Sequence, residues 1–216
     1  MTISDALNAA LLAHRANNLP DARAGYDAVL AAMPDNPDAL YLRGMIHLVE
    51  GELEQGEALT RRAIAAKPDF PEALGNLGRI AVARGKPDLA IQIWQKSLRL
   101  KPGEAEIRLE LGRALVAAKR HADAVANQLV GLLQTPDDPA MLLVLGNALQ
   151  GQGQTDAALA TYRRGVALQP DNADHQHNLG VSLFEHREID AAIAQCRRRQ
   201  LPRRDCRRSQ RRRPAL

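Results

Sequence analysis

The sequence contains few aromatic residues and almost no cysteine. Phe, Trp and Tyr make up 3% of the 216 residues, whereas hydrophobic residues as a whole make up 45%. A core must therefore be built from Leu, Ala, Ile and Val, which favours helices and argues against an all-β fold. The two cysteines, Cys196 and Cys206, both lie near the C-terminal end. They cannot form a disulfide framework for the whole chain.

Long hydrophobic runs are also missing. No run of roughly 18 apolar residues occurs, which is the length at which a membrane helix becomes a candidate. The N-terminal segment carries the acidic Asp5 where a secretory signal would carry positive charge. These two absences predict a cytoplasmic protein that makes no contact with a membrane.

Positive charge is confined to one end of the chain. The formal net charge is +4. Residues 197–216 contain ten Arg and a single acid, Asp205, so this segment carries +9 and the first 196 residues carry −5. The excess of positive charge therefore belongs to the C-terminal segment alone.

Proline recurs at intervals of 34 residues along the chain. With the first unit starting at Ile3, the units begin near residues 3, 37, 71, 105, 139 and 173, and the proline occupies position 32 of each complete unit. Small residues recur at positions 8 and 20, where two helices can approach closely. The residues at these three positions are Pro34, Pro68, Pro102, Pro136 and Pro170; Ala10, Gly44, Gly78, Gly112, Gly146 and Gly180; and Ala22, Gly56, Ala90, Ala124, Ala158 and Ala192.

Each unit divides into two helical halves, at about positions 2 to 14 and 18 to 31. In the third unit the turn between them runs from Arg84 to Asp88; Gly85 can adopt a positive φ there, and Asp88 is expected to cap the second helix. Apolar and small residues fall on one face of each helix. In the third unit these packing residues are Leu74, Leu77, Gly78 and Ala81, followed by Ala90, Ile91, Trp94, Ser97 and Leu98.

This pattern resembles the tetratricopeptide repeat family, whose 34-residue unit has Leu-Gly at positions 7 and 8, Ala at 20, an aromatic at 24 and Pro at 32. The resemblance covers residues 3–199, with an incomplete last unit. It implies an all-α fold, a right-handed α-α superhelix of about six helix-turn-helix units. Arg43 departs from the pattern at position 7, and we expect its guanidinium to extend past the packed face. The Arg-rich residues 200–216 are expected to be a disordered tail.

The resemblance also implies that the first helices of successive units line a concave groove. Positions 2, 5, 6, 9, 12 and 13 lie opposite the packed face of these helices. The groove is expected to be mostly apolar in the first two units and polar in the later ones; alternatively, a neighbouring helix covers the apolar residues. The candidate peptide-binding residues are Leu7, Asn8, Leu11, Tyr41, Leu42, Met45, Asn76, Arg79, Glu110, Arg113, Asn147, Gln150, His177 and Asn178, and Asp174 lies at position 2 of the sixth unit.

The sequence offers no constellation typical of catalysis, a metal or a cofactor. His175 and His177 are two residues apart on an expected helix and point about 200° away from each other, so they cannot share a metal ion. Gly151 and Gly153 fall in an interhelix turn, with no preceding strand or following Lys for a phosphate loop. Cys196 occupies position 24, a packing position, and Cys206 has no His or acidic partner at a motif spacing, so neither is expected to be a nucleophile. We therefore expect a protein that is not an enzyme and takes no cofactor.

The most direct functional hypothesis is a protein interaction scaffold that holds a partner peptide in the groove. A first alternative is a module that presents substrate for an O-GlcNAc transferase-like glycosyltransferase or a sulfotransferase whose catalytic domain is absent from this chain. A second alternative is binding of nucleic acid or an acidic surface by the Arg-rich tail. The tail lacks aromatics for base stacking, which favours a solvated or non-native ending. The open apolar side of the sixth unit predicts weak self-association.

Overall fold

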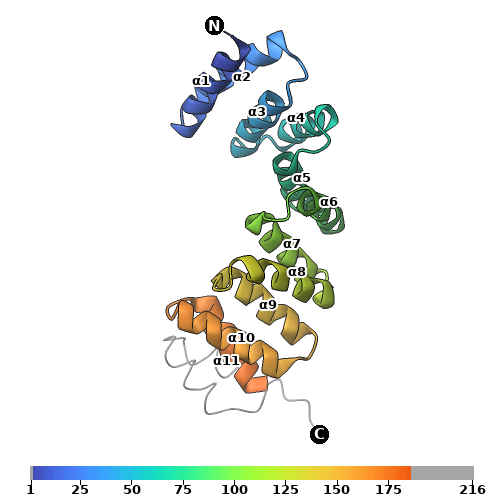
Figure 1. Cartoon of the computed structure of the whole chain (residues 1–216), viewed down its shortest axis with the longest axis vertical. Helices are drawn as coiled ribbons and strands as arrows, with labels where there is room; N and C mark the ends of the chain where they lie inside the picture. Colours follow the sequence, from blue (N-terminus) through green and yellow to red (C-terminus); the bar gives the residue numbers. More distant parts are fainter. Residues whose placement is uncertain (1, 186–216) are drawn as a thin grey trace. The chain divides into compact units, whose positions relative to one another are not determined.

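The computed structural model describes residues 2–185, and within this range the chain forms eleven helices and no strand (Figure 1). The all-α fold class is therefore confirmed. No helix among these residues is long and apolar enough to cross a membrane. The helices are α1 (Ile3–Arg15), α2 (Leu19–Ala32), α3 (Pro37–Val49), α4 (Leu53–Ala66), α5 (Pro71–Ala83), α6 (Pro87–Leu100), α7 (Ala105–Ala117), α8 (His121–Gln134), α9 (Pro139–Gly151), α10 (Thr155–Leu168) and α11 (Ala173–Glu185).

The helix boundaries repeat with the 34-residue period. Odd-numbered helices have 13 residues and even-numbered helices 14. Three first helices begin with proline, at Pro37, Pro71 and Pro139, where the missing N–H has no intrahelical partner to lose. Asn36 and Asp138 cap α3 and α9 by accepting a hydrogen bond from a backbone N–H. Local sequence therefore fixes where these first helices start.

The turn inside each helix pair contains one residue in the left-handed region. Its φ is +82° at Gly51, +69° at Gly85 and +74° at Gly153, and +57° at Asn17 and +58° at Lys119. All five residues occupy position 15 of their units. Glycine adopts this conformation without steric cost, whereas Lys119 has a Cβ that opposes it.

The expected cap at Asp88 is wrong. Helix α6 already begins at Pro87, and Lys86 occupies the cap position without a side-chain hydrogen bond. Because Pro87 takes the first helical position, Asp88 falls within the first turn. There its carboxylate interacts favourably with the helix dipole instead of capping the helix.

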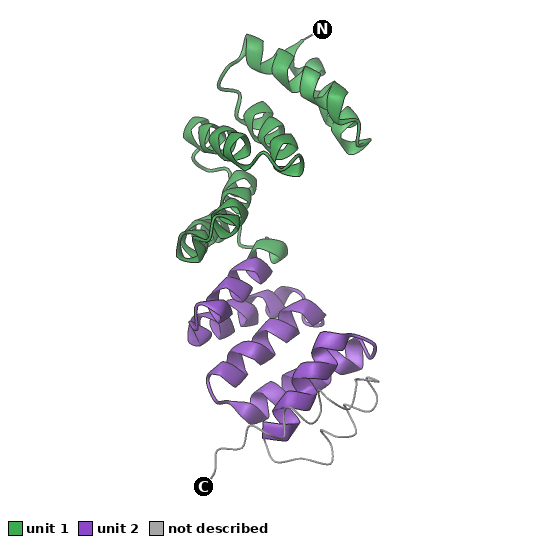
Figure 2. Ribbon diagram, turned by 180° about the vertical axis from the view of Figure 1, so that it is seen from behind, with its two compact units in different colours: residues 1–107 green, residues 108–216 purple. Residues whose placement is uncertain are grey.

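The chain divides into two compact units, residues 1–107 and 108–216 (Figure 2). In the first unit, one core cluster surrounds Tyr26 and Ile46 and another joins Leu40, Phe70 and Ala73. The described part of the second unit has a core built by α9, α10 and α11. Its buried members are Leu145, Leu149, Ala158, Leu159, Tyr162, Leu179 and Leu183.

Small residues at position 8 allow the bulky residue at position 24 to pack inside the same helix pair. A Cβ placed on Gly78 would lie 2.2 Å from Nε1 of Trp94, and one on Gly146 would lie 2.3 Å from Cε1 of Tyr162. Ala90 at position 20 is fully buried. The predicted packing faces of the third unit are therefore confirmed, because Trp94 and its predicted neighbours Ile91, Ser97 and Leu98 are buried.

Two arginines depart from the apolar pattern and are accommodated by polar partners. The Arg43 guanidinium does not extend into free solvent; its Nε lies 2.8 Å from the half-exposed Asp27 carboxylate and its Nη1 lies 2.8 Å from His47. Arg108 is 7% exposed, and its Nη1 donates to Asn127 at 3.3 Å. Burial lowers the pKa of Arg108.

Three predictions fall outside the described residues. They are the end of the repeat array at residue 199, the Arg-rich tail of residues 200–216 and the self-association of the sixth unit. The hypothesis of nucleic-acid binding depends on the same segment.

Candidate functional site

In the first compact unit, predicted groove residues from α3 and α5 form one hydrogen-bonded cluster. Asn76 is 4% exposed. Its Nδ2 donates to the Tyr41 hydroxyl at 3.2 Å and contacts the Met45 sulfur. Arg79 completes the cluster by donating from Nη1 to the Asn76 Oδ1 at 2.9 Å. Asn76 therefore joins two successive repeats, and its polar groups are already engaged inside the protein.

Charged residues border this cluster. Nη2 of Arg79 lies 2.7 Å from Oε1 of Glu106, so its positive charge is paired. Lys101 lies 3.0 Å from the Glu72 carboxylate and also contacts Glu104. Burial raises the pKa of the Tyr41 hydroxyl, which is therefore neutral at physiological pH. The cluster offers hydrogen bonds and balanced charge, but no reactive group.

In the second compact unit, α9, α10 and α11 build a cluster around the side-chain amides of Asn147 and Gln150. Oδ1 of Asn147 accepts hydrogen bonds from the Tyr162 hydroxyl at 2.7 Å and from Nδ2 of Asn178 at 2.9 Å. Gln150 accepts from Ser182 at 3.2 Å and donates to the Glu185 carboxylate at 2.7 Å. Burial raises the pKa of Tyr162, so its hydroxyl remains a neutral hydrogen-bonding group.

The two clusters are built from the same repeat positions. Asn76 and Asn178 both occupy position 6 of their 34-residue repeats, and each contacts position 9 of the preceding repeat, 31 residues earlier. The partners at position 9 are Met45 and Asn147. Within each compact unit, predicted groove residues of successive first helices therefore lie side by side.

Apolar groove candidates near the N-terminus are largely covered. Leu7 and Leu42 are partly buried and pack against the core cluster of Ala10, Tyr26 and Ile46. This contact corresponds to the alternative in which neighbouring helices cover the apolar residues. Leu11 is also partly buried, whereas Asn8 is exposed.

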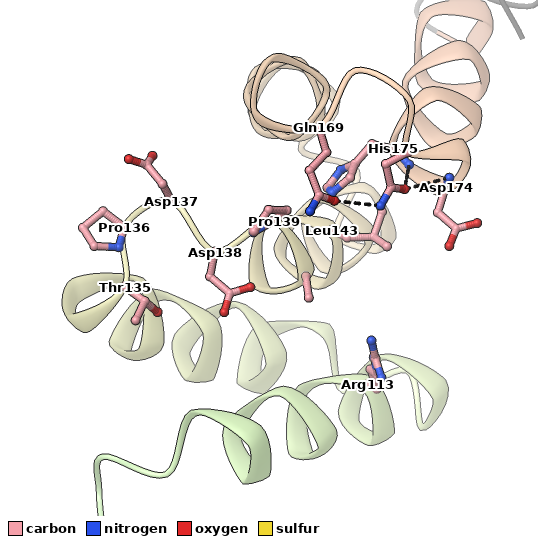
Figure 3. Close-up of a pocket in the computed structure, with 12 residues that line it drawn as sticks. Arg113, Thr135, Pro136, Asp137, Asp138, Pro139, Leu143, Gln169, Asp174 and His175 are labelled. Atoms are coloured by element: carbon pink, nitrogen blue, oxygen red, sulfur yellow. Dashed lines mark hydrogen bonds between the residues drawn. The ribbon is translucent and has the colours of Figure 1, made fainter.

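The second compact unit, residues 108–216, contains a hollow of about 620 Å³ that is lined by the first helices of its repeats and the loops before them (Figure 3). Arg113 approaches it from α7, and the loop that contains Asp137 and Asp138 forms one side. Leu143 of α9 forms part of its floor, and Asp174 and His175 at the start of α11 form the opposite side. Helices α7, α9 and α11 thus contribute to one binding-sized space.

Some charged side chains that line the hollow have hydrogen-bond or ion-pair partners, and others have none. Asp137 accepts a hydrogen bond from Arg164 at 2.7 Å, and Asp138 accepts one from the Met141 N–H at 3.0 Å. The side chain of Arg113 is exposed and forms no ion pair or hydrogen bond with the described residues. The carboxylate of Asp174 is likewise exposed and makes no such bond there. Among residues 2–185, the hollow is therefore bordered by one positive and one negative side chain that form no ion pair or hydrogen bond.

The two neighbouring histidines have separate environments. His175 is 1% exposed, and its ring packs against Gly165, where a Cβ would lie 2.2 Å from Nδ1. Burial lowers the pKa of His175. His177 is exposed, so the two rings lie on different faces of α11, as the spacing predicts. Glu110, the remaining groove candidate, is half-buried.

His47, Glu50 and Glu52 bring potential metal ligands within 4.8 Å of one another. Their existing contacts compete with a metal ion. Arg43 donates to Nε2 of His47, so in the neutral ring Nδ1 carries the proton and points at Glu52. Glu50 is paired with Arg23. Neither ring nitrogen therefore retains a free lone pair, and the group consists of hydrogen bonds of His47 to Arg43 and Glu52 beside the ion pair of Arg23 and Glu50.

The repeated helix pairs match a known family. The sequence model for the tetratricopeptide repeat matches residues 7–71, 76–139 and 143–204, which together make up most of the chain. The chain belongs to the tetratricopeptide repeat family. A comparison with curated protein sequences finds no match.

Solved structures with the same fold include YrrB, described as a tetratricopeptide repeat protein with an unusual peptide-binding site. It is 22% identical with a TM-score of 0.71, covering 80% of this chain and 89% of YrrB. PilW, a type IV pilus biogenesis factor, is 19% identical with a TM-score of 0.74, covering 92% of both chains. MamA from Desulfovibrio magneticus RS-1 is 19% identical with a TM-score of 0.72, covering 76% of this chain and 93% of that one.

The loop residues that border the hollow are not among those predicted from the sequence. Asp137, Asp138 and Asn172 occupy positions 33 and 34, between one unit and the next, whereas only first-helix positions were considered for binding. A signal was present, because Asp recurs at position 33. It appears as Asp35, Asp69, Asp137 and Asp171.

Proposed function

We propose that this protein is a non-catalytic interaction scaffold that binds a polypeptide segment of a partner protein along its first helices. The observation that carries the proposal is the lateral contact between groove residues of successive repeats, as in the pair Asn147 and Asn178. Such contacts fix amide and hydroxyl groups in a row, and fixed polar groups bind a peptide backbone at a lower entropic cost.

The chemistry of the inner face supports binding over catalysis. The first helices carry amides and paired carboxylates, as at Gln150 and, in the other compact unit, Glu106. Both side chains are at least partly exposed and can hydrogen-bond to the backbone of an extended segment. The Tyr162 hydroxyl is buried and holds Asn147 and Gln150 in place. The description of YrrB as having a peptide-binding site gives the same fold a precedent for this use.

A charge-matched pair of variants tests the proposal. The inner-face variant carries Asn8→Glu, Arg113→Glu and His177→Glu, three exposed groove residues on α1, α7 and α11. The control variant carries Ala28→Glu, Lys96→Glu and Ala167→Glu, three exposed residues on the second helices α2, α6 and α10. Both variants change the net charge by the same amount, so non-specific electrostatic effects cancel.

Peptides are first selected on the full chain from a random library of 12-residue sequences, and their affinity is then measured by fluorescence anisotropy. The inner-face variant should bind the selected peptides at least about tenfold more weakly, a loss of about 1.4 kcal/mol. The control variant should bind them normally. Equal affinities for the two variants, or failure of the wild-type chain to select any peptide, would contradict the proposal.

A further inference from the structure

We infer that the hollow in the second compact unit selects a peptide segment in which an acidic and a basic residue flank an apolar residue. This inference rests on the proposed function and names the class of segment that this part of the groove takes.

Two charged side chains at the edge of the hollow have no partner in the described part of the chain. Arg113 and the Asp174 carboxylate have no ion-pair or hydrogen-bond partner among residues 2–185. The remaining carboxylates are engaged, Asp137 by Arg164 and Asp138 by the start of α9. A segment with only negative charge would be repelled by Asp174, and one with only positive charge would be repelled by Arg113. A segment with an acidic and a basic residue can pair the acidic residue with Arg113 and the basic residue with Asp174.

Helix spacing sets the separation of the two ligand charges. Helix α7 packs on α9, since a Cβ on Gly112 would lie 3.1 Å from Val144, and α9 contacts α11 through Asn147 and Asn178. Packed helices are about 8 to 10 Å apart, so Arg113 and Asp174 start roughly 16 to 20 Å apart. An extended peptide rises about 3.3 Å per residue. The acidic and basic residues should therefore be about five or six positions apart.

The surface between the two charges selects the middle of the segment. Pro139, Ala140 and Leu143 line this part of the hollow and are partly buried, leaving apolar surface that an apolar side chain can cover. Gln169 and Asn172 add amide groups beside it, which suit the peptide backbone. The resulting pattern is acid, apolar centre, base.

The first test uses the peptides selected on the full wild-type chain from the random library described above. We expect them to be enriched in acid and base pairs about five or six positions apart with an apolar residue between. Arg113→Gln and Asp174→Asn should each weaken binding by about three- to tenfold, because each removes one charge pair at a partly exposed site. Arg120→Gln and Asp156→Asn, which change exposed charges outside the hollow, serve as controls and should leave affinity unchanged.

The second test exchanges the charges. In the double variant Arg113→Glu with Asp174→Lys, synthetic Ac-Glu-Ser-Val-Leu-Ser-Lys-amide and its charge-inverted form Ac-Lys-Ser-Val-Leu-Ser-Glu-amide should exchange their order of affinity relative to wild type. A structural role for these residues would not reverse a preference. Unchanged preference, or selected peptides without the charge pattern, overturns the inference. If the peptides selected on the wild-type chain still bind the inner-face variant more weakly than its control variant, the proposed function stands without the inferred charge pattern.

Discussion

Gly78 lies so close to the indole of Trp94 that a Cβ at this position would come within 2.2 Å of Nε1. The same nitrogen donates a hydrogen bond to the Gly75 carbonyl at 2.9 Å. The indole therefore cannot move away from Gly78 without losing this bond. The close approach of α5 and α6 depends on the absence of a side chain at one position.

Gly78→Ala should destabilise the full chain by about 1 to 3 kcal/mol, because the added methyl group overpacks against a rigid ring. Chemical denaturation followed by circular dichroism measures this change. Gly103→Ala is the matched control, since a Cβ there has no atom within 4 Å. Equal stabilities for the two variants would contradict the packing described for α5 and α6.

Lys119→Gly should stabilise the protein by about 0.5 to 1 kcal/mol. Lys119 has φ +58° in a turn whose equivalents in three other repeats are glycines, and glycine removes the steric cost of this conformation. The opposite change, Gly85→Ala, should destabilise by a similar amount or more, since φ there is +69°. Denaturant titration of both variants measures the pair. A loss of stability in Lys119→Gly would show that its side chain contributes more than its backbone strain costs.

The buried His175 should make the last described helix less stable in mild acid. Burial lowers its folded pKa below the ordinary 6.5, so the unfolded ring binds a proton first as the pH falls. The contribution is complete above pH 6.5 and is lost progressively from there down to the folded pKa. Amide hydrogen exchange in α11 should therefore become faster between pH 7 and pH 5.5, after correction for intrinsic rates.

His175→Met supplies the control for this pH dependence. The preceding repeat has Met141 at the same position, packed against Gly131 as His175 packs against Gly165. The variant should keep the packing of α11 and lose the additional acid sensitivity. An identical pH profile for wild type and His175→Met would assign the effect to other groups.

Arg164→Gln should cost about 0.5 to 1 kcal/mol of stability. Its Nη2 donates to the Pro136 carbonyl at 2.9 Å and to Asp137 at 2.7 Å, and its side chain is half-exposed, which limits the contribution of the ion pair. Arg62 makes the same two contacts with Pro34 and Asp35 in the first unit, at 2.8 and 3.2 Å. Arg62→Gln should therefore show a similar loss. Thermal unfolding of both variants tests whether this recurring contact stabilises the loops between repeats.

The repeat architecture could be predicted from the sequence because related constraints recur at the same repeat positions along the described part of the chain. Gly78 and Trp94, or Gly146 and Tyr162, are a small and a large residue 16 positions apart that pack together, and such a pairing is visible in the sequence alone. The positive φ at Gly85 was also predictable, whereas the same conformation at Lys119 was not, since lysine rarely adopts it.

The candidate site was less predictable, because it depends on which neighbours each polar side chain reaches. Arg79 and Arg113 occupy the same repeat position and have the same chemistry. Arg79 is paired with Asn76 and Glu106, while Arg113 is exposed at the edge of the hollow. A helical wheel places both on the inner face but cannot show which charge a neighbouring helix already neutralises.

The left-handed turns give the protein regularly spaced attachment points. At Gly51, Gly85 and Gly153 the space where a side chain would stand has no atom within 4 Å. A short glycine-flanked insertion at such a turn can keep the positive φ and extend into open space without disturbing a helix. Tags, fluorophores or a second binding module could therefore be added at the turn of a chosen repeat without disturbing its helices.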